Sequence, residues 1–313
     1  MIVHWDDVEG ERLERGHLCG TWTDLGTAAG TKGVGVTRIQ VEAGRWSTPA
    51  HVELDEEEIY FVLGGTGLLW QDGKTYEVRA GDCIVERVAE EAHTYRAGDY
   101  GLDILAFGQR TNPTATYLPR AKVVRMAVTL DVSEGRHPWE REAAAGEPEA
   151  PPPSPRPANI ADLSAPDTEE GGSFVELGGQ AGSVRSGLNW IKLDPGRRGP
   201  PPHCHSAEEE IFVVLDGEGI LELWPTPGSP RLHPDFEYEE HSLRRGHVVA
   251  RPPGTRIAHS LRARDAGLTY LVYGTRDTND VCYYPRSNKI FWRGVGLIAR
   301  LEPLDYSDGE PED

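Results

Sequence analysis

Three side chains of types that commonly bind metal ions lie close together in the second half of the chain. His203, His205 and Glu210 precede a short apolar run and a glycine-rich turn. On a β-strand, residues i and i+2 share a face, so the two histidines point together while Cys204 points away. By the same alternation, Glu210 shares a face with Phe212. Two imidazoles and a carboxylate facing one interior predict a transition-metal site.

The same pattern occurs earlier in the chain, which indicates an internal duplication. The motif His51-x-Glu53-x4-Glu58 lies 152 residues before its counterpart at 203–210. Further matches then follow at an offset of 166, for example His93 with His259, because the second half has a longer loop within residues 224–243. A period this long with few gaps predicts two homologous domains and not a solenoid of short repeats.

Length and composition agree with a division into two domains. A chain of 313 residues is long enough for two hydrophobic cores. Between them the sequence turns to Glu, Ala and Pro, a composition that favours extended, semi-rigid conformations over a packed core. We therefore expect an N-terminal domain at 1–133, a linker at 134–158 and a C-terminal domain with an acidic tail at 159–313.

The secondary structure is expected to be β almost throughout. Short runs rich in Val, Ile, Leu, Tyr and Phe, such as 33–41, 59–63, 211–215 and 268–273, are separated by Gly, Pro and Asp. Stretches with a helical period are scarce. Many short strands at regular spacing predict β-sandwiches or β-barrels.

Charge and cysteine usage exclude several classes of partner. The formal net charge of −19 argues against nucleic acid and against anionic membrane surfaces. The longest apolar runs are far too short to cross a bilayer, and no secretory signal pattern opens the sequence. The four cysteines form no CxxC pair. Reduced thiols in the cytoplasm are therefore expected.

Together the clustered residues resemble the paired motifs of the cupin superfamily, and the duplication makes the chain similar to a two-domain bicupin. The family motifs are Gly-x5-His-x-His-x3-4-Glu-x6-Gly and Gly-x5-Pro-x-Gly-x2-His. The second half matches them at Gly196, His203, His205, Glu210 and Gly217, and at Gly246, Pro252, Gly254 and His259. Six residues follow Gly196 where the family has five, and His259 comes two residues late. The first half departs further, with Glu53, Arg87 and Ala89 in place of the usual residue types and His93 one residue late. The resemblance covers about residues 20–125 and 172–290.

This resemblance implies two tandem jelly-roll β-barrels, each with a metal site in its interior. In the second barrel the implied ligands are His203, His205, Glu210 and His259. Three neutral imidazoles and one carboxylate leave a net charge of about +1 on a divalent ion, and suit Fe, Mn or Ni, with Zn, Co or Cu as alternatives. If the ion is octahedral, its two open positions can hold a bidentate oxygen ligand, or one substrate atom and O2.

The first barrel has the corresponding residues for a second metal ion, with a different charge. Its implied ligands are His51, Glu53, Glu58 and His93. Two imidazoles and two carboxylates neutralise a divalent ion and favour harder ions such as Mn²⁺. Without a metal, the two glutamates would repel each other and one would tend to take up a proton. The alternative is a vestigial site that is kept for packing.

The sequence constrains the cavity residues and the reaction less than it constrains the metal ligands. Tyr60 and Phe212 hold matched inward positions two residues after the ligand glutamates and are the candidate cavity residues, with packing in the core as the alternative. The resemblance favours a dioxygenase-type oxidoreductase acting on a small oxygenated or aromatic molecule in the second barrel. The alternatives are a non-oxidative isomerase, lyase or decarboxylase, and a non-catalytic protein that binds a small ligand. Edge strands and the resemblance favour a homodimer.

Overall fold

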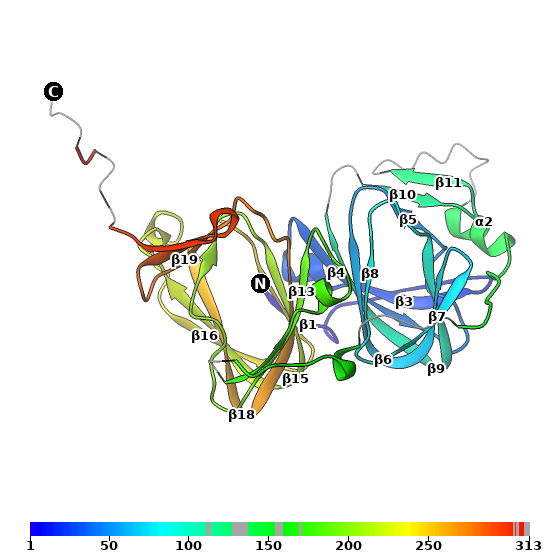
Figure 1. Cartoon of the computed structure of the whole chain (residues 1–313), viewed down its shortest axis with the longest axis horizontal. Coiled ribbons are helices and arrows are strands. Elements are labelled where there is room, and N and C mark those ends of the chain that lie inside the picture. Colours follow the sequence, from blue (N-terminus) through cyan, green and yellow to red (C-terminus); the bar gives the residue numbers. More distant parts are fainter. Residues whose placement is uncertain are drawn as a thin grey trace.

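The computed structural model describes residues 1–110, 114–126, 137–153, 159–168, 171–302, 304 and 307–309. Figure 1 shows two β-barrels next to each other, with few helical turns. The predicted all-β fold with two barrels from an internal duplication is confirmed. None of the helices in these ranges is long and apolar enough to span a membrane.

The first barrel is built on a seven-stranded antiparallel sheet and a three-stranded one. The large sheet runs in the order β2 (Glu11–Arg15), β3 (Leu18–Asp24), β4 (Val34–Val41), β9 (His93–Gln109), β6 (Glu58–Gln71) and β7 (Lys74–Arg79), with β8 (Cys83–Glu86) paired to β6. The small sheet contains β11 (Val123–Met126), β10 (Ala115–Leu118) and β5 (Val52–Glu53). It lies at one end of the barrel (Figure 1).

The second barrel repeats this plan. Its large sheet runs in the order β1 (Ile2–His4), β17 (His247–Arg251), β15 (Glu210–Pro225), β18 (Ile257–Gly274), β13 (Gly187–Leu193) and β12 (Gly172–Val175), with β16 (Glu239–Arg244) paired to β15. Its small sheet contains β14 (Cys204–His205), β19 (Val281–Tyr284), β20 (Lys289–Trp292) and β21 (Leu297–Arg300). The short helices are α1 (Leu25–Ala29), α2 (Pro138–Ala144), α3 (Leu177–Gln180), η1 (Ile160–Asp162), η2 (Ser229–Arg231) and η3 (Arg293–Val295).

The longest strand pair in each barrel, β6 with β9 and β15 with β18, carries the same irregularities. The register shifts between Gly65 and Gly67 in the first barrel and between Gly217 and Gly219 in the second. At both Gly65 and Gly217 the backbone φ is positive, and an added Cβ would lie 2.2 Å from a carbonyl oxygen of the partner strand. Only glycine fits there, which explains why the turn after each acidic motif is rich in it.

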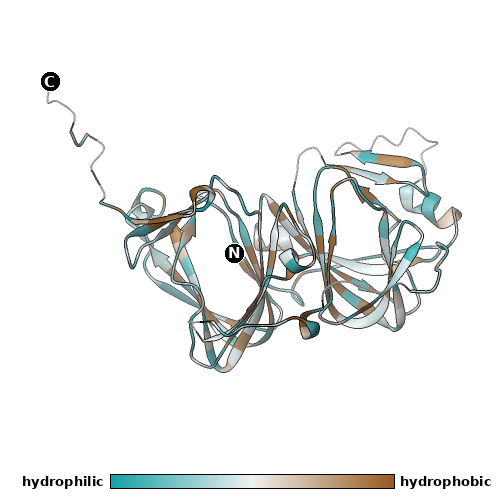
Figure 2. Ribbon diagram, in the orientation of Figure 1, coloured by the Kyte–Doolittle hydropathy of each residue, from teal (hydrophilic) through white to brown (hydrophobic). Residues whose placement is uncertain are grey.

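The alternation of side chains along β6 and β15 divides the hydrophobic residues between two kinds of core. Phe212 and Val214 pack inside the second barrel. The intervening Ile211 and Val213 face the first barrel and join a core to which both barrels contribute. Figure 2 shows hydrophobic residues on the strands where the barrels meet. The barrels are therefore packed face to face through their large sheets.

Two buried glutamates extend this contact from one barrel into the other. The carboxylate of Glu209 accepts hydrogen bonds from the backbone N–H groups of Lys32, Gly33 and Val34. The carboxylate of Glu57, the matching residue of the first barrel, accepts from the loop at 183–186 in the second. We call this reciprocal pair the glutamate clasp. Each of its members directly precedes a predicted ligand glutamate.

The N-terminal strand of the chain belongs to the sheet of the second barrel. Strand β1, which was assigned to the first domain, pairs with β17 of the second barrel, with Ile2 opposite Val249. The sequence could not indicate this, because the free edge of β17 that receives β1 is created only by the fold. The division into 1–133, 134–158 and 159–313 otherwise stays a prediction.

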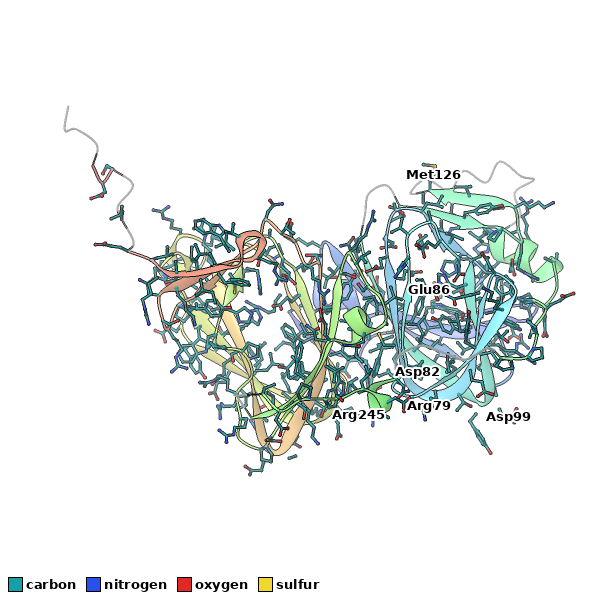
Figure 3. All side chains as sticks on the ribbon, in the orientation of Figure 1. Arg79, Asp82, Glu86, Asp99, Met126 and Arg245 are labelled. Atoms are coloured by element: carbon teal, nitrogen blue, oxygen red, sulfur yellow. The ribbon has the colours of Figure 1, made fainter. Side chains whose placement is uncertain are left out.

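The described part of the predicted linker, residues 137–153, packs on the first barrel. Trp139 of α2 contacts Trp22 edge to face, with ring centroids 5.0 Å apart. Glu142 accepts a hydrogen bond from Arg120 at 2.6 Å. Further on, Asn159 donates to Asp82 at 2.6 Å, at the end of the barrel where Figure 3 labels that residue. The described part of the connection thus lies against the first barrel.

Candidate metal centres

The four predicted ligands of the second barrel come from three separate segments. His203 and His205 lie on the segment that forms β14, Glu210 begins β15, and His259 lies near the start of β18. His203 and His259 exchange both backbone hydrogen bonds, at 3.1 and 2.8 Å. This local pairing places their imidazoles together, with ring centroids 4.7 Å apart.

These four side chains converge on one carboxylate oxygen. Glu210 Oε2 lies 2.9 Å from His259 Nε2, 3.2 Å from His205 Nε2 and 3.9 Å from His203 Nε2. The ligand atoms of His203, Glu210 and His259 all lie within 4.8 Å of one another. The structure thus brings the four predicted ligand residues together, including His259 despite its late position in the motif.

The outer nitrogens of two of these histidines are held so that the inner ones face the cavity. His203 Nδ1 lies 2.8 Å from the carbonyl oxygen of Pro201, which can only accept, so Nδ1 carries the proton. His205 Nδ1 lies 2.7 Å from Asp280 Oδ2. His205 Nε2 is buried and makes no well-aligned hydrogen bond among the described residues, although Glu210 Oε2 lies 3.2 Å away. A metal ion would be bound from this nitrogen.

The electrostatics of the group also suit a cation. Burial lowers the pKa of His259 to about 3 and lowers that of His203 as well. Burial acts the same way on His205, but the carboxylates of Glu210 and Asp280 outweigh it and raise its pKa to about 10. Burial disfavours the charged form of Glu210, yet His205 and His259 hold its pKa well below the usual range. A positive charge is thus stabilised beside Glu210, and a metal ion would displace the proton on His205.

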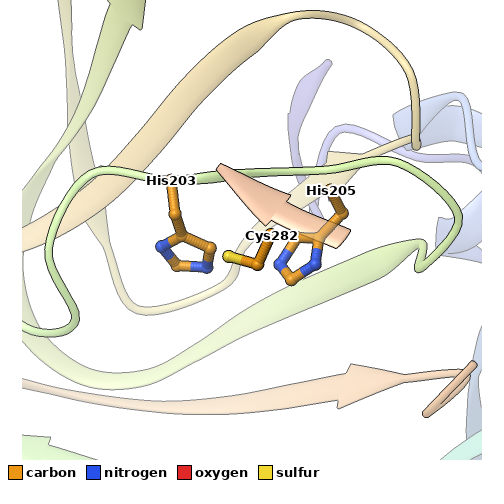
Figure 4. Close-up of side chains that lie close together, drawn as sticks. All are labelled: His203, His205 and Cys282. Carbon is orange, nitrogen blue, oxygen red and sulfur yellow. The ribbon is translucent and has the colours of Figure 1, made fainter. Parts of the chain in front are cut away.

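Two residues that lie next to this centre were not predicted from the sequence. Asp280 is buried, and besides His205 it accepts the backbone N–H groups of residues 206, 207 and 208 through Oδ1. Cys282 lies opposite His205 in the pairing of β14 with β19, and its sulfur lies within 4.8 Å of ligand nitrogens of His203 and His205 (Figure 4). Nothing local marks either residue, because a strand pairing over more than 70 residues of sequence brings them here.

A cavity of about 230 Å³ opens onto the four side chains. Its walls are largely apolar and include Phe212, one of the two candidate cavity residues. Its polar lining beyond the ligands includes Asn189, Tyr284 and Arg293, and the Arg293 guanidinium forms an ion pair with Glu208. The cavity is the size of a small organic molecule, and its lining includes the Arg293 guanidinium.

The first barrel gathers three of its four predicted ligands. Glu58 Oε2 lies 3.3 Å from His93 Nε2 and 3.5 Å from His51 Nε2. Glu53 stands further off, with Oε1 4.0 Å from His51 Nε2, because the hydroxyl of Thr116 donates to its carboxylate at 2.9–3.0 Å. His51, Glu58 and His93 form the compact group, and Glu53 lies at its edge.

Tyr60, the second candidate cavity residue, touches these ligands directly. Its hydroxyl donates to Glu58 Oε2 at 3.0 Å and lies 3.1 Å from His93 Nε2. Burial and the nearby charge of Glu58 raise the pKa of Glu53 to about 7, as the predicted repulsion between the two carboxylates requires. Burial lowers the pKa of His93, but Glu86 and Glu58 outweigh it and raise that pKa to about 9. Figure 3 labels Glu86 in this barrel.

Comparisons with known proteins agree with this architecture. The family model described as "Cupin domain" matches residues 37–100. No curated protein sequence matches the chain. Among solved structures, an oxalate decarboxylase–formate complex from Lactobacillus farciminis has a TM-score of 0.60 at 16% identity, covering 88% of this chain and 86% of its own. Bacillus subtilis oxalate decarboxylase, in a study of its Mn(II) centres, has a TM-score of 0.60 at 14% identity, covering 90% of this chain and 78% of its own. At these identities the likeness is one of fold.

Proposed function

Because the chain is a two-barrel member of the cupin superfamily, we propose that its second barrel binds a divalent transition metal and catalyses a non-oxidative reaction on a small organic acid. The proposed ligands are His203, His205, Glu210 and His259. The observation that carries the proposal is the convergence of three imidazole nitrogens on Glu210 Oε2 at the wall of a small buried cavity.

The residues present fit such an ion. His203 has its proton on Nδ1, which leaves Nε2 free to bind, and His205 Nε2 is buried without a well-aligned hydrogen bond among the described residues. Asp280 holds the His205 ring in one orientation, an arrangement that raises the basicity of the ligand. When bound, the ion would act as a Lewis acid that polarises a carbonyl or carboxylate oxygen.

The remaining polar groups of the cavity favour an acid as substrate. Arg293 supplies a guanidinium, whose planar fork matches a carboxylate. In the structure it is paired with Glu208, so a substrate carboxylate would compete for it. Phe212 and the other apolar walls limit water around the reacting group, which strengthens these electrostatic contacts.

This proposal prefers the non-oxidative alternative to the dioxygenase that the sequence favoured. The structural neighbours support it, since both are oxalate decarboxylases. A guanidinium in the cavity also suits the breakdown or rearrangement of an acid better than the oxidation of a neutral aromatic ring. Mn²⁺, Fe²⁺ and Ni²⁺ are the ions to test first, one per second barrel, with a second ion in the first barrel.

The test begins with metal content and ends with the reaction. We expect His203→Ala combined with His205→Ala to remove one equivalent of metal, while His233→Ala, an exposed histidine, removes none. Metal-loaded protein is then offered oxalate and small keto acids, with CO2 release and O2 uptake recorded together. CO2 release without matching O2 uptake supports the proposal. Stoichiometric O2 uptake would instead favour the dioxygenase, and full metal retention in the double variant would refute the site.

A further inference from the structure

The two barrels differ at one ligand position, and the residue facing that position differs with it. In the second barrel, β14 pairs with β19 so that His205 lies opposite Cys282. In the first, β5 pairs with β10 so that Glu53 lies opposite Thr116. Opposed residues of an antiparallel pair share a face, with their Cβ atoms about 4.5–5.5 Å apart. Cys282 and Thr116 therefore occupy corresponding places beside the two centres.

Cys282 is placed to act as a ligand. It is 3% exposed and lines the same 230 Å³ cavity as the predicted ligands. Its sulfur and the nearest nitrogens of His203 and His205 lie within 4.8 Å of one another, and Figure 4 shows the sulfur between the two rings. The buried Nε2 of His205, which makes no well-aligned hydrogen bond among the described residues, is a second observation that points to a ligand here.

The matching residue of the first barrel does something different. Thr116 uses its hydroxyl to donate to both oxygens of Glu53 and so supports a hard carboxylate. A cysteine in a site rich in imidazole adds a soft donor instead. A bound cation deprotonates a coordinating thiol outright.

We propose that Cys282 coordinates the metal ion of the second barrel together with His203 and His205, and that it gives this barrel a preference for thiophilic ions. The first barrel, with Thr116 and two glutamates, keeps a preference for hard ions such as Mn²⁺. The inference rests on the proposed function in one respect, namely that the second barrel binds a metal at all. It adds a ligand and a difference in selectivity between the two barrels.

Co²⁺ loading of the full-length protein tests the ligand directly. A thiolate bound to Co²⁺ gives a charge-transfer band in the near ultraviolet, whereas imidazole and carboxylate ligands give only the weaker visible bands. We expect the near-ultraviolet band in the wild type and its loss in Cys282→Ser, which still binds Co²⁺. Cys204→Ser is the matched control, because Cys204 lies on the paired strand β14, opposite Tyr283, and does not line the cavity of the second barrel.

Selectivity gives a second readout that is independent of activity. In Cys282→Ser we expect the affinity of the second barrel for Cd²⁺ to fall about tenfold or more, while its affinity for Mn²⁺ changes by less than about threefold. A wild-type protein that binds Co²⁺ without the charge-transfer band, or a band that persists in Cys282→Ser, overturns the inference and leaves the proposed metal site intact. If the combined His203→Ala and His205→Ala variant keeps all its Co²⁺, the proposed function fails as well.

Discussion

The glutamate clasp gives the sharpest prediction about how the barrels hold together. Glu209 is 2% exposed, and its Oε2 accepts from Gly33 and Val34, while the N–H of Lys32 lies 2.9 Å from Oε1 and 3.2 Å from Oε2. Hydrogen bonds to a charged group contribute about 1.5–3 kcal/mol each, and a buried donor left unpaired costs about 1–3 kcal/mol. Glu209→Ala leaves three backbone donors without their acceptor. We therefore expect it to lower the free energy of unfolding by about 3–6 kcal/mol.

Glu209→Gln should lie between this variant and the wild type. Its amide oxygen can replace Oε2 and keep the bonds from Gly33 and Val34, but its NH2 group then faces the N–H of Lys32. The shorter of the two contacts from Lys32 is lost and the charge is removed, so a loss of about 2 kcal/mol in the free energy of unfolding is expected. Glu57→Gln should lower the free energy of unfolding by a similar amount, because the Glu57 carboxylate accepts hydrogen bonds from residues 183–186 in the same way.

These changes in stability are measured by unfolding the metal-free protein in urea and monitoring the transition with two probes, tryptophan fluorescence and circular dichroism. The matched control is Glu218→Gln, since Glu218 is exposed on the strand that follows Glu209, and it should change stability by less than about 0.5 kcal/mol. The two probes should also give one coincident transition, because both barrels contribute to one core. A Glu209→Gln variant as stable as Glu218→Gln would refute the clasp.

Three other predictions follow from the packing around the sites. Asp280→Asn should weaken metal binding in the second barrel by about 10–100-fold, measured by competition with a chelator, because Asp280 orients a ligand imidazole. Arg120→Ala should destabilise the protein by about 3 kcal/mol near pH 8, because it leaves the buried Glu142 carboxylate unpaired. Burial already raises the pKa of Glu142, so the folded state binds a proton at Glu142 more tightly than the unfolded state does. The destabilisation caused by Arg120→Ala should therefore become smaller as the pH falls toward about 5, which urea unfolding at a series of pH values would measure. Trp5→Ala should cost about 3–5 kcal/mol in the same assay, whereas Tyr100→Ala, at a side chain that is 95% exposed, should cost less than about 0.5 kcal/mol.

The sequence could predict whatever depends on spacing within one strand or on the repeat. The alternation of β15 separates Glu210 and Phe212, which face the barrel interior, from Ile211, which faces the other barrel. The offset between the halves identified His259 and His93 as partners of their motifs, and the structure places both beside the ligand glutamates. These features need only local geometry and a matching of two similar segments.

The sequence could not predict contacts that arise when remote strands pair. Cys282 and Asp280 reach the second centre through the pairing of β19 with β14. Strand β1 crosses to the second barrel because β17 offers it a free edge. The linker composition indicated an extended spacer, yet Trp139 and Glu142 bury themselves on the first barrel. In each case long-range packing outweighed the local preference.

The glutamate clasp, in contrast, had a signal in the sequence that was not used. Residues 56–58 and 208–210 are both runs of three glutamates, and alternation turns the middle one away from the ligand that follows it. A repeated acidic residue facing away from the metal needs a partner of its own, because a buried carboxylate without hydrogen bonds is costly. The partner was available only in the other barrel, and the structure places it there.

This adjacency links each candidate metal centre to the interface between the barrels. Glu209 and Glu210 are consecutive residues, so the backbone that holds the clasp also positions the proposed ligand Glu210. A shift of one barrel against the other would move the start of β15 and thus Glu210 Oε2, on which three imidazoles converge. A truncated protein that begins at residue 159 would also lose β1 and would expose the core that the two barrels share. The first barrel therefore supports the geometry of the second centre, whether or not it performs chemistry of its own.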